Sequence, residues 1–492
     1  MASKRTVLIG AGRRITIDEL LAVAVHGTAS FELFVPKGEE VKEESSLPSV
    51  VDLSVGLAAI SRKDDEGLMN KPESVASLAL VALAVAQGRI LPKGSDCEGL
   101  CAVLVGVLQA ADASEQDFRL SFEASDYLQE IKELVPPCYA DLIVQLSKSF
   151  VQRMNHCAIG ALAAGRARQL SQMANPIAAL SAERVDGVDA SAFSDLYYDI
   201  LRPHRESATS ATIMRAVLNG SQYVPLTPRV GLKYAADGCS DEACAVMDAP
   251  QQNGPAREAI KSACKVIELE LNCSEPDGKS KYDESVFEIS VENTKSAVKT
   301  MLGGCLARRG VKPNDISIPE NDIYISIQSL VTSLKSNLES EAVECIDFIK
   351  SEVVRAEEAA KKKEAEKAAK AAAFQNRNED GNSKADEFAG MSEEKKAKIL
   401  KKRAEKEAKA RAKAAAKEKK KVTLFGSGTL PISNALSKGC EVSPTSVDLN
   451  ESVVNEVNSI VEKLLSGGIQ RKPKIAKGTR DYLPEQVSCC RS

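Results

Sequence analysis

The chain has 492 residues, a length that suggests about three domains of roughly 150 residues each. Apolar residues make up 43% and charged residues 27%, which excludes collagen, silk and a wholly disordered chain. Aromatic residues contribute only 4%, with no Trp, while Ala, Leu, Val, Lys and Glu dominate. This composition favours helices over a β-sandwich, and we expect a mainly α protein.

The net charge of −4 hides a strong segregation of charge along the chain. Residues 391–421 contain 14 Lys and Arg against 5 Glu, a local charge of +9 that leaves −13 for the rest.

The longest apolar stretch, Leu78–Ala86, is well short of the ~20 residues needed to cross a bilayer. The N-terminus lacks a secretory pattern, and 13 Cys are scattered mostly singly, so we expect a cytoplasmic protein with reduced thiols.

The predicted elements begin with a short strand at Thr6–Ile9 and a second strand at Phe31–Val35. Between them, Thr16 and Glu19 have the spacing of a capping box, which predicts a helix from Ile17. The pattern is then repeatedly helical, with predicted helices at Ser77–Gln87, Cys97–Ala111, Asp126–Leu134, Tyr139–Met154, Ala158–Leu170, Ala190–Leu201, Ala208–Leu218, Ala256–Leu269, Val291–Arg308 and Ile323–Leu334. Residues 1–340 are therefore expected to form a helical bundle behind a small N-terminal strand pair.

Beyond this bundle, residues 341–421 are rich in Lys, Ala and Glu and predict long charged helices with a break near 375–390. The second of these helices, Ser392–Lys420, would extend ~44 Å and has no apolar stripe to bury. Residues 422–476 are expected to be a polar, partly disordered linker containing an amphipathic helix at 451–465.

The basic helix is the clearest candidate for binding nucleic acid. Regularly spaced cations can displace counterions from a phosphate backbone without reading sequence. The candidate RNA-binding residues are Lys395, Lys398, Lys402, Arg403, Lys406, Lys409, Arg411 and Lys413. No aromatic residue lies among them, which argues against base stacking. A solvated spacer helix and a nuclear import signal near Lys401 are the alternatives for this segment.

Two places resemble the histidine and phenylalanine ammonia-lyases, in addition to the opening Val7–Val35. One is the Leu-Arg-Pro-His-Arg-Glu string at Leu201–Glu206, and the other is Ile213–Ser221, a Leu-containing helix that ends in Gly-Ser. The resemblance implies a bundle of long helices. That family cyclises an internal Ala-Ser-Gly into its electrophile, but this sequence contains no Ala-Ser-Gly, and Lys93–Asp96 stands near the expected place. We therefore expect an ammonia-lyase-like bundle without catalytic residues of its own.

A string near the end resembles the start of the class II core in plant-type cytosolic histidyl-tRNA synthetases. Its family-motif residues are Lys477, Gly478, Thr479, Arg480, Asp481 and Pro484, within residues 477–486. The resemblance implies histidine–tRNA ligase activity, with ATP and magnesium in the full-length family. Because the motifs for ATP and histidine are missing, we expect a truncated chain, inactive alone and without a cofactor, that keeps weak electrostatic tRNA binding.

The partners expected from this interpretation are tRNA and a second chain, either a homodimer or a dimer with a full-length isoform, and no membrane. The alternative is a noncatalytic helical scaffold or dimerisation protein with a basic tether. Metal binding is not expected, because Cys97-x3-Cys101 and Cys239-x4-Cys244 lack a clear second pair of ligands. The Gly10-Ala-Gly12 turn lacks the third glycine of a dinucleotide fingerprint.

Overall fold

A computed structural model describes most of the first 379 residues and one later helix. The described residues are 5–10, 12–34, 67–88, 90–91, 94–113, 118–201, 203–218, 221, 224, 239–273, 285–312, 322–379 and 448–465. They divide between two compact units, one containing residues 1–349 and 442–469 and the other beginning at Lys350. The second predicted charged helix and the 477–486 string lie outside the described residues.

The N-terminus forms the predicted strand pair. Strands β1 (Arg5–Ile9) and β2 (Ala29–Leu33) pair in parallel, with Val7 opposite Phe31. Helix α1 (Ile17–Ala24) connects them, as a parallel pair requires a crossover. The capping box is formed as the sequence predicts, because the Glu19 amide donates to Thr16 Oγ1 and the Thr16 amide donates to Glu19 Oε2.

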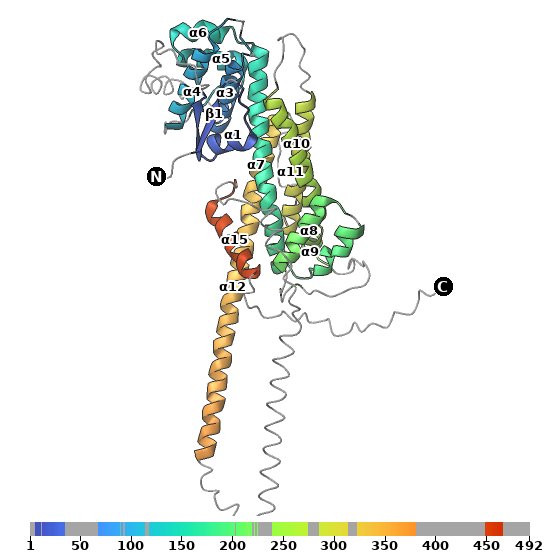
Figure 1. The fold of residues 1–492 in the computed structure, drawn as a ribbon. Coiled ribbons are helices and arrows are strands. Elements are labelled where there is room, and N and C mark those ends of the chain that lie inside the picture. The colour runs from blue at the N-terminus through green and yellow to red at the C-terminus, as the bar shows by residue number, and fades with distance from the viewer. Residues whose placement is uncertain are drawn as a thin grey trace, which may run out of the picture. The chain divides into compact units, whose positions relative to one another are not determined.

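The other described residues of the first unit are mainly helical, so the mainly α prediction is confirmed (Figure 1). The helices and helical turns of this part are α3 (Lys71–Ala86), α4 (Cys97–Ala113), α5 (Ala124–Leu134), α6 (Pro137–Val144), α7 (Lys148–Arg184), η1 (Ala190–Phe193), η2 (Leu196–Leu201), α8 (Arg205–Leu218), α9 (Asp241–Met247), α10 (Ala249–Leu271), α11 (Ser285–Arg308) and α15 (Glu451–Leu465). Helix α12 (Ile323–Glu379) starts in this unit and continues beyond it. Among the described residues, every helix is too short or too polar to cross a bilayer.

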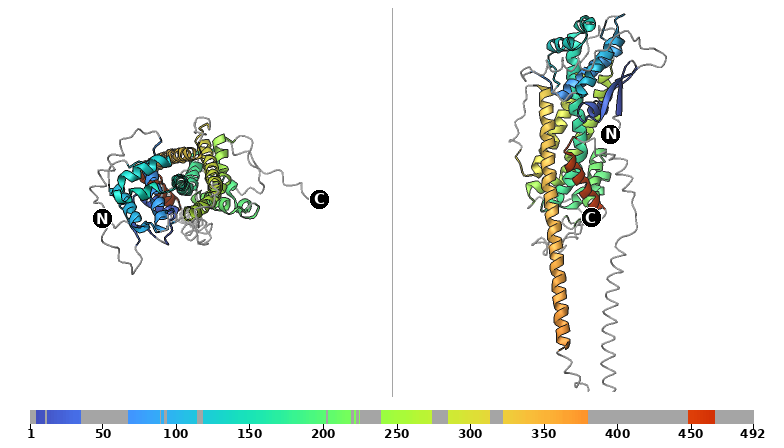
Figure 2. Two further views of the ribbon diagram at one scale, coloured as in Figure 1. Left: turned by 90° about the horizontal axis from the view of Figure 1, so that it is seen from above. Right: turned by 90° about the vertical axis from the view of Figure 1, so that its left-hand side faces the viewer.

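Helix α7 is the centre of the bundle and differs from the prediction. Its 37 residues extend about 55 Å and join segments that the sequence pattern assigned to two separate helices. It packs against α1, α3, α5, α8, α10 and α11, and the end-on view in Figure 2 shows it surrounded by other helices. A helix buried on all sides has no polar face, so its apolar periodicity is too weak to reveal its length.

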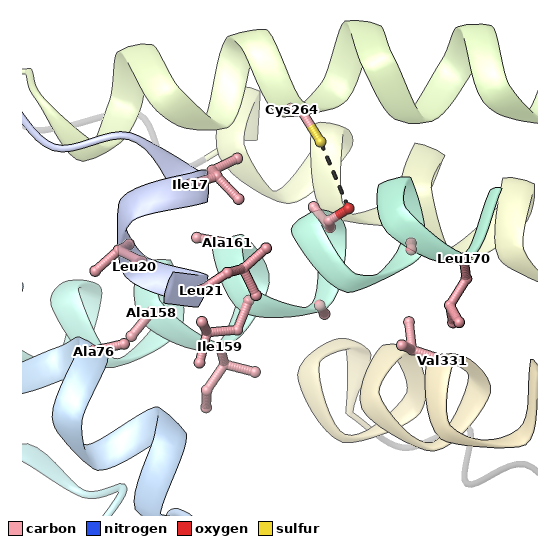
Figure 3. Packing of buried hydrophobic residues seen from close by; sticks show 14 of the residues in the cluster. Ile17, Leu20, Leu21, Ala76, Ala158, Ile159, Ala161, Leu170, Cys264 and Val331 are labelled. Atoms are coloured by element: carbon pink, nitrogen blue, oxygen red, sulfur yellow. Dashed lines mark hydrogen bonds between the residues drawn. The ribbon is translucent and has the colours of Figure 1, made fainter. Parts of the chain in front are cut away.

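Small residues let neighbours approach α7 closely. A Cβ built on Gly165 would lie 2.5 Å from Ile17 Cγ2 and 2.6 Å from Leu21 Cδ1. Figure 3 shows Ile17, Leu20 and Leu21 of α1 against Ala158 and Ala161 of α7, with Leu170 facing Val331. The core therefore extends from α1 across α7 to α12.

The other late helices also extend or confirm the predictions. Helix α12 runs without a break from Ile323 to Glu379, so the predicted break begins no earlier than residue 380. Its side chains between 356 and 370 are almost all exposed and charged or Ala, as expected for a charged helix. Helix α15 occupies the predicted range 451–465, and Asp448 just before it pairs with Arg166 and Lys335 of the bundle.

Candidate ligand-binding site

A small cavity lies where η2 meets the first turns of α8 and α10. Its volume is about 190 Å³, room for on the order of six water molecules. The lining consists of two aromatic side chains, three polar side chains and one proline, namely Tyr197, Tyr198, His204, Ser207, Gln251 and Pro255. Such a mixture of aromatic faces with a few convergent polar groups is typical of sites for small organic ligands.

The two tyrosines are presented by an unusual backbone. Segment η2 is a π-helical turn, a conformation found often at functional sites. Their rings meet edge to face, with centroids 4.9 Å apart at an interplanar angle of 86°. Tyr198 is buried, whereas Leu196 and Ile200 on the same segment are 57% and 67% exposed. The turn thus directs its aromatic side chains inward and its large aliphatic side chains to solvent.

Arg215 of α8 holds this π-helical turn in place. Its Nη1 donates to the Phe193 carbonyl oxygen at 2.8 Å and lies 2.5 Å from Asp195 Oδ1. Its Nη2 lies 3.6 Å from Asp199 Oδ2, so one guanidinium contacts Asp195 just before the turn and Asp199 within it. The segment is therefore anchored to the helix that supplies Ser207 to the pocket.

A charged layer lies beside the polar wall of the pocket. Glu206, next to Ser207, accepts from Lys261 Nζ at 2.7 Å and lies 3.8 Å from Arg257 Nε. The Arg257 side chain is only 4% exposed, and within the described part of the chain no acceptor reaches its Nε or Nη1. Two cations thus face one carboxylate, and the local excess of positive charge favours an anionic group nearby.

The helices behind the pocket are in close contact. A Cβ added to Gly254 would lie 2.5 Å from Ser207 Cα, so α8 and α10 pack backbone to backbone here. Buried hydrogen bonds also join these helices to α7. Asn253 Nδ2 of α10 donates to Asn175 Oδ1 of α7 at 3.0 Å, and Asn175 Nδ2 donates to Ser210 Oγ of α8 at 2.9 Å. All three of these side chains are buried, and their hydrogen bonds fix the wall that carries Ser207 and Gln251.

Sequence reasoning identified this site only in part. His204 and Pro203 belong to the Arg-Pro-His string that the sequence analysis singled out, and His204 lines the pocket. Tyr197 and Tyr198, which lie shortly before that string, and the residues of α10 were missed. A signal was available for the tyrosines, since two adjacent aromatic residues are conspicuous in a chain with only 9 Tyr.

The other predicted site residues do not join this pocket. The basic residues between 395 and 413 and the 477–486 string lie outside the described residues. Cys97 and Cys101 lie on α4, where burial raises the pKa of Cys101 to about 12. In the described ranges, no three His, Cys, Asp or Glu side chains gather closely enough to hold a metal ion.

Comparison with known proteins finds a family-model match to the segment that holds the pocket. A family model for aromatic amino acid lyases matches residues 154–277. The match includes all six residues that line the cavity, and it covers both strings from which the ammonia-lyase resemblance was drawn. No curated protein matches the chain.

Solved structures of two such enzymes were also found. Phenylalanine ammonia-lyase from Rhodosporidium toruloides is 14% identical, with a TM-score of 0.47 over 94% of this chain and 85% of that chain. Tyrosine aminomutase from Streptomyces globisporus is 13% identical, with a TM-score of 0.45 over 70% of this chain and 88% of that chain.

These findings correct the prediction of a histidyl-tRNA synthetase. The family model that matches is that of the aromatic amino acid lyases, so the assignment to a class II histidine–tRNA ligase was wrong. That assignment depended on ten residues, 477–486, a string too short to outweigh a family match over 124 residues. The alternative of a noncatalytic scaffold gains no support from the match either.

Proposed function

We propose that the bundle binds an aromatic amino acid, or an aromatic carboxylic acid of the same size, in the pocket between η2, α8 and α10. The observation that carries the proposal is that the segment matched by the aromatic amino acid lyase model contains the entire lining of this pocket. The chemistry of the lining supports the same class of ligand.

Each part of such a ligand has a complementary group in the site. The rings of Tyr197 and Tyr198 offer aromatic surface for the ligand's ring. His204, Ser207 and Gln251 offer hydrogen-bonding groups for its amino and carboxyl groups. The excess positive charge of Arg257 and Lys261 over Glu206 favours the ligand's carboxylate.

The proposal concerns binding and does not include elimination of ammonia. The sequence contains no Ala-Ser-Gly from which the electrophile of the related ammonia-lyases is made. At Lys93–Asp96 the order Lys-Gly-Ser-Asp cannot supply that ring. Without an electrophile to withdraw electrons, the side chains of the pocket offer hydrogen bonds and aromatic contact but no means of activating the leaving amine.

Isothermal titration of the full chain with phenylalanine, tyrosine, histidine and cinnamate tests the proposal. We expect saturable binding of an aromatic ligand that Tyr197→Ala weakens at least tenfold, because the variant removes an aromatic wall. Leu196→Ala is the matched control, since Leu196 lies on the same turn but is exposed. Absence of binding, or equal binding by both variants, overturns the proposal, and formation of cinnamate or urocanate overturns its restriction to binding.

We also propose that residues 391–421 bind tRNA through charge alone. The support is the local charge of +9 and the spacing of its cations at three and four residues. The residues proposed to contact phosphates are Lys395, Lys398, Lys402, Arg403, Lys406, Lys409, Arg411 and Lys413. A gel shift with total tRNA at two salt concentrations tests this, and unchanged binding after deletion of 391–421 contradicts it.

We propose a cytoplasmic location as well. The described residues hold ten cysteines, and none of these is in a disulfide, which suits a reducing compartment. Fractionation of cells with an antibody to the chain tests the location, and recovery in a secreted or membrane fraction contradicts it.

A further inference from the structure

Two cysteines at the start of α9 are in contact and remain accessible. Cys239 lies one residue before the N-cap Ser240, whose Oγ accepts from the Ala243 amide at 3.2 Å. Cys244 lies four residues after that N-cap, in the second half of the helix's first turn. The two thiols are close enough to interact electrostatically, and both side chains are half-buried.

The capping geometry explains why these thiols meet. In a helix N-terminus, the residue before the N-cap and the fourth residue after it pack side by side, usually as an apolar pair that fixes the entry of the chain. Here both positions of that pair are Cys. The same contact that is normally hydrophobic can therefore be made covalent by oxidation.

Both thiols are partly exposed, and an open cavity lies beside the residues between them. The cavity, of about 520 Å³, is lined by Ser240 and Glu242, which lie between the two cysteines, and by Arg184 and Arg309. Among the other described cysteines, Cys101, Cys305 and Cys345 are buried, whereas Cys138 and Cys273 are exposed. Contact and access thus coincide at Cys239 and Cys244.

We propose that Cys239 and Cys244 are a reversible thiol modification site that closes to an intramolecular disulfide at the N-terminus of α9. A small disulfide such as oxidised glutathione is the oxidant. One cysteine thiolate attacks it, forming a mixed disulfide and releasing one reduced glutathione. The second cysteine thiolate then attacks the mixed disulfide, the Cys–Cys bond forms and a second glutathione leaves, so two electrons pass to the oxidant.

The rate of this reaction should be low near neutral pH. Burial, with the interaction with Cys244, raises the pKa of Cys239 to about 11. Only ~10⁻⁴ of that thiol is therefore the reactive thiolate at pH 7. The site is suited to a slow, structural response to a lasting oxidant and not to rapid catalysis of thiol exchange.

Peptide mapping of the full chain tests the proposal directly. Trypsin releases both cysteines in one peptide, residues 234–257, which contains no other Cys. After prolonged incubation with oxidised glutathione at mildly alkaline pH, we expect this peptide to be lighter by two hydrogen atoms and resistant to alkylation until a dithiol reductant is added. In the same sample, the exposed Cys138 and Cys273 should carry glutathione.

Matched variants and a structural readout complete the test. In Cys244→Ser, Cys239 has no partner, and we expect it to be recovered as a mixed disulfide with glutathione. Oxidation of the unaltered chain should also slow amide hydrogen exchange in the first turn of α9. The proposal is overturned if the 234–257 peptide keeps two alkylatable thiols while Cys138 is modified, or if glutathione stays attached to the 234–257 peptide. It is also overturned if oxidation leaves amide hydrogen exchange in α9 unchanged.

Discussion

Removing the carboxylate of Glu341 should destabilise the bundle severely. Glu341 of α12 and Arg308 of α11 are both fully buried and face each other in a two-pronged pair. Arg308 Nε donates to Oε1 at 2.7 Å, Nη2 donates to Oε2 at 3.0 Å, and Ser181 Oγ of α7 donates to Oε1 at 2.6 Å. Three helices therefore converge on one carboxylate.

The magnitude follows from the charge that Glu341→Ala would leave behind. Breaking a buried ion pair by removing one partner costs about 3–5 kcal/mol, because the remaining charge is desolvated and uncompensated. The double variant Arg308→Met with Glu341→Leu removes both charges at similar volume, and such replacements are often neutral or stabilising. We therefore expect Glu341→Ala to be strongly destabilised and the double variant to recover most of the loss.

Urea denaturation followed by circular dichroism measures both variants against the unaltered chain. The Glu366→Ala variant is a suitable control, since Glu366 pairs with Lys370 on the same helix where both side chains are exposed, and such pairs contribute about 0–1 kcal/mol. A loss below about 1 kcal/mol for Glu341→Ala would refute the reasoning, and so would a double variant less stable than the single one.

The same pair gives a pH dependence with a defined sign. Burial alone would raise the pKa of Glu341, but the charge and hydrogen bonds of Arg308 outweigh it and hold that pKa below its usual value. A carboxyl with a lowered folded-state pKa contributes stability above the unfolded pKa and loses it as pH falls through the folded pKa. Stability should therefore fall below about pH 4, and this fall should be smaller in the double variant.

Three further outcomes follow from local contacts and charge. Gly254→Ala should cost about 1–3 kcal/mol in denaturation experiments and weaken ligand binding, because its Cβ would meet the Ser207 backbone; wild-type stability would contradict the close packing. Thr16→Ala should cost about 1 kcal/mol by removing the cap of α1, and Thr16→Ser should restore it. Deleting 391–421 should make tRNA affinity less dependent on salt concentration. An unchanged salt dependence would mean that this segment does not contact the tRNA.

Features set by neighbouring residues were the most predictable from the sequence. The Thr16 and Glu19 capping box and the helix at 451–465 depend on contacts within a few residues or on strong amphipathic periodicity. Helix α7 was predicted in pieces because it is buried on every side, and burial removes the polar face on which periodicity depends.

The candidate site was less predictable, since it is made by tertiary packing. Tyr197 and Gln251 lie 54 positions apart and meet only because Gly254 lets α8 and α10 come into contact. The contact between Cys239 and Cys244 depends on where α9 begins, which the sequence analysis did not assign. The synthetase assignment failed for a different reason. It relied on a string of ten residues, whereas the family match extends over a much longer segment.

Photolabelling tests the proposed binding site most directly. A phenylalanine analogue with a photoreactive ring would be irradiated with the full chain and the labelled peptides identified. The label should fall on residues 196–207 or 251–255 and be displaced by excess aromatic amino acid. Labelling confined to other segments, or label that excess ligand does not displace, would contradict an aromatic amino acid site in this pocket.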